Sequence, residues 1–153
     1  MRPHTVQART LVKVVLELVA QPCLFGAGSD RLSALPTHPC HTDVVAAFRF
    51  ADACARAVAE FFTRYDYLLT PTSACVAWPV EQVYPNVIEN KEVGPRGHAV
   101  FTPLFNLALT PGISVPCGTG RDGLPVGLQI VAPRLHDRPL LAMAQRAETA
   151  LAR

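Results

Sequence analysis

The side chains that could act as nucleophiles are few and stand apart in this sequence. Its serines and lysines are Ser29, Ser33, Ser73 and Ser114, with Lys13 and Lys91. A serine attacks a carbonyl carbon only when a base lies within hydrogen-bond reach and preorganised donors stabilise the oxyanion. No serine is flanked by a glycine run, and Ser114 lies in Ile-Ser-Val-Pro, which is typical of a strand interior and not of a nucleophile's exposed turn. The sequence therefore predicts no catalytic residue, and Ser114 is expected to be structural.

Cysteine and histidine give no clear metal or disulfide pattern. The five cysteines are Cys23, Cys40, Cys54, Cys75 and Cys117. Because their number is odd and no Cys-x-x-Cys spacing occurs, neither a disulfide framework nor a zinc knuckle is supported, and a reducing cytoplasm is the expected location. His38, Cys40 and His41 share one short turn with no distant cluster to complete a four-ligand site, so no metal is expected. Cys117 has no neighbouring histidine or basic residue in sequence to activate it.

Composition favours one folded domain without a nucleic-acid or membrane partner. The chain has 153 residues, 50% hydrophobic and 17% charged, and its net charge of +2 arises from scattered basic residues. Scattered charge argues against a dedicated nucleic-acid binder. The apolar run Thr10–Ala20 contains Lys13 and Glu17 and is far shorter than the roughly 20 residues of a membrane span. The glycines from Gly118 to Gly123 precede a strand instead of a helix, so no small-molecule cofactor is expected.

Three stretches have the periodicity of amphipathic helices. The first covers residues 5–20, and the second begins at Thr42. The second helix is expected to bury a stripe of Val44, Phe48, Ala51, Ala55, Val58 and Phe62. On its opposite face, Asp52 and Arg56 are spaced for an i,i+4 ion pair. The third begins at Asp137 and is expected to bury Leu140, Leu141, Ala144, Ala147 and Leu151.

Short apolar runs between proline and glycine predict the strands. They cover Tyr65–Leu69, Ile113–Val115 and Val126–Val131, with Asp122-Gly123 as the reversal between the last two. Three glycines are expected to be required by backbone geometry and close packing: Gly112, Gly118 and Gly123. The loop of residues 73–97 is long, and such loops are usually functional or mobile. The pattern predicts an α/β or α+β fold with a mixed sheet.

The prolines and glycines that bound the strand regions are placed as in a known family. The stretches Phe101–Gly118 and Asp122–Val131 are similar to the C-terminal signature of the amidase-signature hydrolases, and Tyr65–Thr72 resembles the strand and turn before it. The resemblance implies that residues 42–153 are the C-terminal part of an amidase domain, about a third of a large α/β/α sandwich around a mixed sheet. Residues 1–41, an expected helix and connection, resemble nothing that can be placed.

The resemblance also implies which residues face a substrate. Phe101, Thr102, Phe105 and Asn106 would form a pocket wall, and Trp78 either joins that wall or pins its loop to the core. Family members that use glutamine tend to carry an acidic residue just before the Phe-Thr pair. This chain has His-Ala-Val at positions 98–100, which favours a general amidase.

The catalytic groups of the resembled family come from a Gly-Ser-Ser-Gly-type segment and an upstream lysine, and neither occurs in this sequence. We therefore expect the C-terminal portion of a hydrolase that cleaves carboxamide C–N bonds by serine acyl transfer, inactive alone and acting on a small-molecule amide once completed. A stand-alone binding or interaction module derived from the fold, a subunit of a glutamine-dependent amidotransferase, and a diverged unrelated hydrolase remain open. Uncovered apolar strands also predict homo-oligomers or association through exposed apolar surface.

Overall fold

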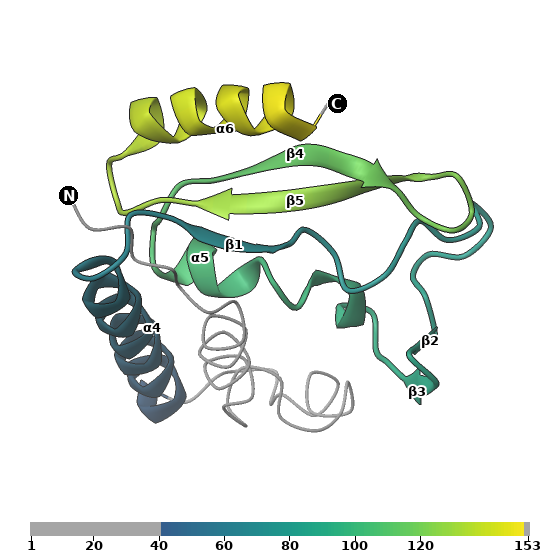
Figure 1. Ribbon diagram of the computed structural model, residues 1–153. Helices are drawn as coiled ribbons and strands as arrows, with labels where there is room; N and C mark the ends of the chain where they lie inside the picture. Colours follow the sequence, from purple (N-terminus) through teal and green to yellow (C-terminus); the bar gives the residue numbers. More distant parts are fainter. Residues whose placement is uncertain (1–40, 152–153) are drawn as a thin grey trace.

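The computed structural model describes residues 41–151 and arranges them in three layers. A three-stranded sheet lies in the middle, with helix α6 (Asp137–Leu151) over one face and helices α4 (His41–Phe62) and α5 (Pro103–Leu107) over the other (Figure 1). This arrangement confirms the α/β class. The expected helix at residues 5–20 and the turn at residues 38–40 lie outside the described residues.

The central strand of the sheet is the most deeply buried element. Strand β5 (Pro125–Val131) pairs antiparallel with β1 (Leu68–Pro71) on one side and with β4 (Gly112–Thr119) on the other. Ile130 packs toward α6 and Val131 toward α4 and α5, and both are 0% exposed. Alternate residues of a strand point to opposite faces, so a strand covered on both faces is apolar throughout. All three strand pairs within residues 41–151 are antiparallel, so the parallel pair of a mixed sheet does not occur there.

The strand boundaries differ from those expected. The first strand begins at Leu68 and not at Tyr65, and it includes Pro71. Strand β4 extends beyond Val115 through Pro116. Both prolines are tolerated because β1 and β4 are the outer strands of this three-stranded sheet, where a missing N–H donor leaves no ladder bond broken.

At two of the three predicted positions the backbone has a positive φ, which favours glycine. Gly123 in the β4–β5 turn has a φ of 74° and Gly118 at the end of β4 has a φ of 118°, values that other residues rarely adopt. The prediction for Gly112 is wrong in this structure. A Cβ there would lie 3.8 Å from Val131 Cγ2, an ordinary van der Waals contact.

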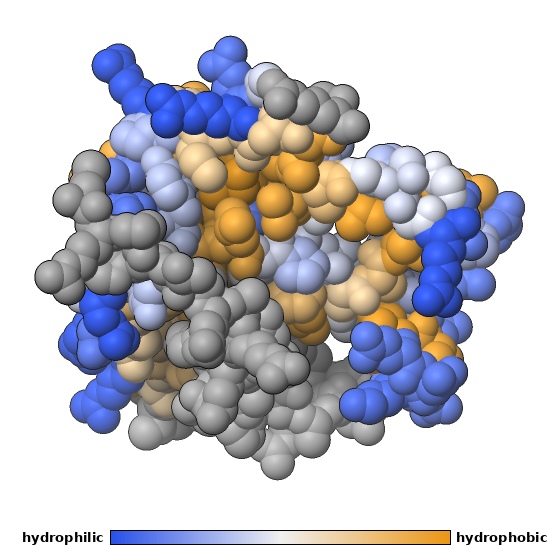
Figure 2. Space-filling view, viewed as in Figure 1, coloured by the Kyte–Doolittle hydropathy of each residue, from blue (hydrophilic) through white to orange (hydrophobic). Residues whose placement is uncertain are grey.

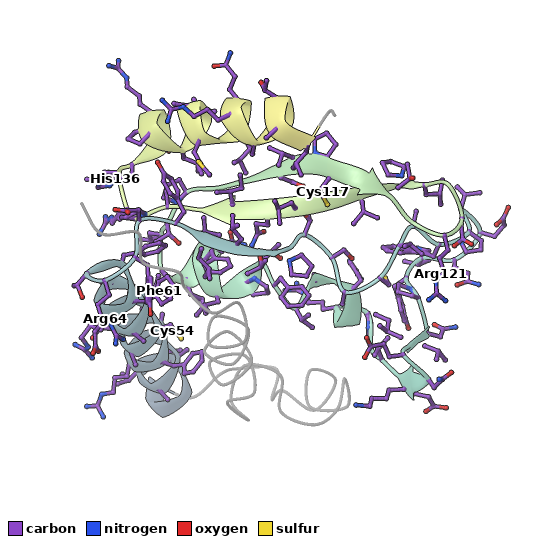
Figure 3. The ribbon with its side chains drawn as sticks, in the orientation of Figure 1. Cys54, Phe61, Arg64, Cys117, Arg121 and His136 are labelled. Carbon is purple, nitrogen blue, oxygen red and sulfur yellow. The ribbon has the colours of Figure 1, made fainter. Side chains whose placement is uncertain are left out.

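Helix α4 buries a narrower stripe than the sequence predicts. Its buried residues are Cys54, Val58 and Phe61, all in the second half of the helix (Figure 3). Phe48, expected in the stripe, is 71% exposed and does not join the core cluster. The predicted pair between Asp52 and Arg56 is confirmed, with 2.8 Å between Oδ2 and Nη2. It is exposed, so it adds only a few tenths of a kcal/mol.

Helix α6 begins at Asp137, as predicted, and covers the sheet with Leu140 and Ala144. Leu141 and Leu151 were expected on the buried face, but they are 60% and 44% exposed. A single helix over one sheet face buries only the narrow stripe that points at the sheet. Within the described part of the chain, no helix is both long enough and apolar enough to cross a bilayer.

The long loop after β1 is partly ordered. It contains the short antiparallel strands β2 (Val87–Ile88) and β3 (Lys91–Glu92), and it ends in the 3-10 helix η1 (Gly97–Ala99). This loop projects from one end of the sheet in Figure 1 and brings η1 back toward α5. The start and end of the loop thereby frame the cleft described next.

Candidate functional site

A cleft of about 880 Å³ lies where β1 ends and the long loop begins. Its floor comes from β4 and β5, and its wall comes from the two ends of the loop. The volume falls in the range of about 300–1,000 Å³ that is usual for small-molecule sites. The described lining residues are Thr72 to Trp78, His98, Ala99, Thr102, Ser114, Val115, Pro116, Pro125, Val126 and Gly127. None of them is Asp, Glu, Lys or Arg.

Two hydroxyl groups meet on the floor of the cleft. Thr72 Oγ1 lies 2.6 Å from Ser114 Oγ, and either oxygen can be the donor. Gly127 makes this contact possible, because a Cβ at that position would lie 2.7 Å from both oxygens. The Thr72 N–H also donates to the Gly127 carbonyl at 3.2 Å, which holds the start of the loop against β5. Sequence reasoning missed this pair because its members lie 42 residues apart.

The wall of the cleft is held by the backbone of His98. Its carbonyl accepts from Ser73 Oγ at 3.1 Å and from the Ala74 N–H at 3.0 Å, so the beginning and end of the long loop are tied together. The His98 ring lies 4.9 Å from the Trp78 ring, between centroids, at a tilt of 52°. Trp78 Nε1 donates to the Gln82 carbonyl at 3.0 Å. The Trp78 ring is therefore held at the cleft, with the His98 ring packed beside it.

A buried amide connects the cleft to the core. Gln129 is 7% exposed, and its Nε2 donates to Thr70 Oγ1 at 3.0 Å and to the Phe101 carbonyl at 3.1 Å. Thr70 is itself only 4% exposed, so each group satisfies the other in a dry environment. This bridge positions Phe101 and the following Thr102 against the sheet. The glutamine stands within an apolar run, which is the one sequence signal that could have identified it.

The structure brings only two of the five predicted site residues to the cleft. Trp78 and Thr102 line it. Phe101 is half-buried and packs on the core below the sheet, where Phe105 is buried at 5% exposure. Asn106 is exposed on α5 and does not line the cleft. A substrate-facing role for these three residues stays a prediction.

The described residues contain no assembled nucleophile. The only hydrogen bond of Ser114 Oγ within residues 41–151 is to Thr72, and no base reaches it. Burial raises the pKa of the Cys54 thiol above its ordinary value of 9.0, which favours the unreactive protonated form. Cys117 lies in β4, in a different layer from Cys54 (Figure 3). No cluster of three metal-ligating side chains occurs in this part of the chain.

Figure 2 shows hydrophobic surface gathered over the sheet layer, between α6 and the loop that carries β2 and β3. The cleft thus combines an apolar setting with a few fixed hydroxyl groups. That combination is typical of small-molecule sites.

The fold is that of the amidase-signature enzymes. The chain superposes on a bacterial aryl acylamidase of that family with a TM-score of 0.66, over 95% of this chain and 34% of that one, at 22% identity. It superposes on 6-aminohexanoate cyclic dimer hydrolase, in its complex with substrate, with a TM-score of 0.67, over 94% of this chain and 34% of that one, at 24% identity. At these identities the likeness establishes the fold and nothing further.

Sequence comparison gives the same family. The amidase family model matches residues 30–141, so the chain belongs to the amidase family. It is 33% identical to a glutamyl-tRNA(Gln) amidotransferase subunit of Koribacter versatilis over 93 residues, which are 61% of this chain and 18% of the relative. It is 36% identical to the putative amidase AmiC of Mycobacterium leprae over 95 residues, 62% of this chain and 20% of the relative. An acylamidase of Rhodococcus erythropolis is 36% identical over 89 residues, 58% of this chain and 19% of the relative. The chain thus spans about a fifth of the length of these curated relatives.

Proposed function

We propose that this chain forms the C-terminal portion of an enzyme that cleaves carboxamide C–N bonds by serine acyl transfer. The observation that carries the proposal is the uncharged, hydroxyl-lined cleft at the end of β1, on a chain of the amidase family. The cleft supplies walls and hydrogen bonds for an amide. The attacking serine and its proton-transfer partners would come from the N-terminal part of the domain.

The chemistry of acyl transfer explains this division. Attack on an amide needs a nucleophile, a base and oxyanion donors held together, and losing one donor alone costs about 10²–10³ in rate. Within residues 41–151, the one hydrogen bond of the Ser114 side chain is to the Thr72 hydroxyl. The chain on its own is therefore expected not to hydrolyse amides.

Exposed apolar residues support completion by another polypeptide segment. Val44, Val45 and Phe48 on α4 are 41%, 47% and 71% exposed, and Leu69 on the outer strand β1 is 49% exposed. Surface of this kind commonly marks an interface or leads to association. We expect the isolated chain to be oligomeric, molten or aggregated, which size-exclusion chromatography with light scattering measures directly. A cooperative monomer would favour the stand-alone module.

The test of the proposed function is reconstitution. The chain is expressed alone and together with the N-terminal portion of a related amidase, and ammonia release from simple amides is measured. The chain alone should stay at background, and the reconstituted pair should turn over. Turnover by the chain alone that disappears in Ser114→Ala would refute the proposal and make Ser114 a nucleophile. A soluble, folded pair without amidase activity would also refute it.

A second candidate is a subunit of a glutamine-dependent amidotransferase, favoured by the amidotransferase relative in Koribacter versatilis. Free glutamine carries an ammonium and a carboxylate, and binding both groups in a cleft normally calls for charged partners. The described lining offers none. Assaying glutamine beside simple amides in the same reconstituted pair separates the two candidates.

A further inference from the structure

We propose that helix α4 is an interface through which two copies of this chain pair antiparallel, with Phe48 of each copy in a groove beside Ala55 of the other. This inference goes beyond the proposed function, because the described lining of the cleft contains no residue of α4. It comes from three features of α4: an exposed phenyl ring, a groove on the same face of the helix, and the distance between the two.

One face of α4 carries large apolar side chains at the surface. Val44 is 41% exposed and Phe48 is 71% exposed. The core-facing side of the helix is a different one, which carries Cys54 and Phe61 (Figure 3). At 3.6 residues per turn, Val44 and Phe48 point roughly 110° away from that buried side. An exposed phenyl ring that continues an apolar face is typical of a protein–protein contact.

A groove of about 470 Å³ lies beside the second half of the same face. On α4 it is lined by Ala55, Ala59 and Phe62, and Pro133 is among the residues that line it from the loop after β5. Ala55 and Ala59 lie within about 20° of Phe48 around the helix axis, so the groove and the exposed ring share one face. Two small side chains leave room there, and the phenyl and pyrrolidine rings supply apolar walls.

The ring and the groove fit each other only across two molecules. Phe48 and Ala55 are about two turns, or roughly 10 Å, apart on one helix, so the ring cannot enter the groove of its own chain. A second copy turned by 180° about an axis near Ala51 brings each Phe48 opposite the partner's Ala55 and each Val44 opposite the partner's Ala59. Large residues then meet small ones on both sides, as in an isologous dimer. A parallel pair would place ring against ring and leave both grooves empty.

The charges along the flank of α4 also suit the antiparallel pair. Asp52 Oδ2 lies 2.8 Å from Arg56 Nη2 within one copy. In the pair, Arg49 lies about 3 Å along the helix axis from the Asp52 of the partner subunit. The two Asp52 carboxylates come close to the axis, and each is compensated by Arg56 of its own copy and by the partner's Arg49. Arg56 and Arg134 also line the groove, where a guanidinium group attracts the face of an inserted phenyl ring.

This surface is separate from the one that the outer strand exposes. Leu68 belongs to the core cluster that contains Cys54 and Phe61 of α4. Leu69, which is 49% exposed, therefore points to the opposite face of the sheet. A segment that completes the sheet at β1 leaves the outer face of α4 available for a second copy.

The test is sedimentation velocity of the full chain over a range of concentrations. An interface built on one aromatic anchor per copy is small, so the dimer should dissociate with a Kd on the order of 10 μM. Phe48→Asp should weaken dimerisation at least about thirtyfold, as expected for a central aromatic anchor. Val80→Asp is the matched control, because it places the same charge on a loop residue that is 93% exposed and should leave dimerisation unchanged. Far-UV circular dichroism checks that both variants are folded.

A cysteine near the proposed axis tests the antiparallel register. Ala51→Cys places one thiol of each copy next to its equivalent, so mild oxidation should give a covalent dimer well above the level of the unsubstituted chain. Val80→Cys supplies an equally accessible thiol away from α4 and should stay at that level. The same two variants are then oxidised after co-expression with the N-terminal portion of a related amidase, where the Ala51→Cys product should persist.

Each other result would overturn the inference. A monomeric chain, or association that is equal in Phe48→Asp and Val80→Asp, would show that α4 does not pair. Dimers without the Ala51→Cys product would exclude this register. Loss of that product on co-expression would show that the N-terminal portion covers α4 instead of a second copy. None of these measurements depends on turnover, so an inactive reconstituted pair that still dimerises through α4 refutes only the proposed function.

Discussion

Replacing Gly127 with alanine should destabilise the chain by separating the two hydroxyls on the cleft floor. The added Cβ would lie 2.7 Å from both Thr72 Oγ1 and Ser114 Oγ and 3.2 Å from Thr72 Cβ. Real Cβ atoms essentially never approach another heavy atom closer than 3.0 Å, so both oxygens would have to move away. Rotation of the side chain does not move Thr72 Cβ, and the hydrogen bond from the Thr72 N–H to the Gly127 carbonyl at 3.2 Å holds the backbone that carries it.

The expected magnitude follows from three terms. Overpacking at a tight site costs about 1–3 kcal/mol, and losing the bond between the hydroxyls costs roughly another 1 kcal/mol. Replacing a glycine restricts the unfolded chain and returns about 0.4–1 kcal/mol. The free energy of unfolding should therefore fall by about 1–3 kcal/mol.

Gly112→Ala is the matched control. Gly112 lies in the same sheet, has no positive φ, and would bring its Cβ no closer than 3.8 Å to Val131 Cγ2. Only the unfolded-state term remains, so this variant should be neutral or more stable by up to about 1 kcal/mol. For a chain of this size, 1 kcal/mol corresponds to roughly 2–4 °C in melting temperature.

The assay is thermal or urea unfolding, followed by circular dichroism, of the chain co-expressed with the N-terminal portion of a related amidase, because the chain alone is expected to associate. Ser114→Ala in the Gly127→Ala background removes one of the two oxygens that the new Cβ meets, so it should recover part of the lost stability. Equal stabilities of the two glycine variants would refute the reasoning. A double variant with no recovery would show that the hydroxyl pair is not what the Cβ strikes.

Three further predictions concern other sites. Gln129→Leu should lower the free energy of unfolding by about 1–3 kcal/mol, because the buried Thr70 hydroxyl and the Phe101 carbonyl lose their hydrogen-bond partner. Urea unfolding measures this change. An unchanged midpoint would contradict a stabilising role for the two hydrogen bonds of Gln129. Gly123→Val should lower the melting temperature, because a β-branched residue fits poorly at a φ of 74°, whereas a crystal structure with Gly123 at negative φ would remove the reason. Burial raises the pKa of the Cys54 thiol, so the folded state holds this proton more tightly than the unfolded state does. The resulting stability is fully present below the ordinary thiol pKa of 9.0 and is lost as pH rises from there through the raised pKa of the folded state. Cys54→Val should therefore flatten the decline of the unfolding free energy at alkaline pH. An identical pH profile for the two proteins would contradict this.

The sequence alone identified the features that depend on neighbouring residues. The Asp122-Gly123 reversal, the apolar strand Val126–Val131 and the start of α6 at Asp137 are encoded in short stretches, because turn geometry and strand periodicity are local properties. The amidase family was also recognisable from these stretches, since their motifs occur in a fixed order. The helix over residues 41–62 followed from its periodicity, although its buried face did not.

The tertiary structure decided every feature that depends on contacts between residues far apart in the sequence. Phe48 has the type and spacing of a core residue, yet it is 71% exposed and lies outside the core cluster that Phe50 and the later residues of α4 join. The cleft is another case: Thr72 and Ser114 meet only because β1 and β4 both pair with β5, whose glycine at position 127 leaves room between them. Gln129 likewise finds Thr70 and the Phe101 carbonyl through strand pairing and loop return. Periodicity states that a side chain faces inward or outward, but the register of distant strands determines which side chain it meets.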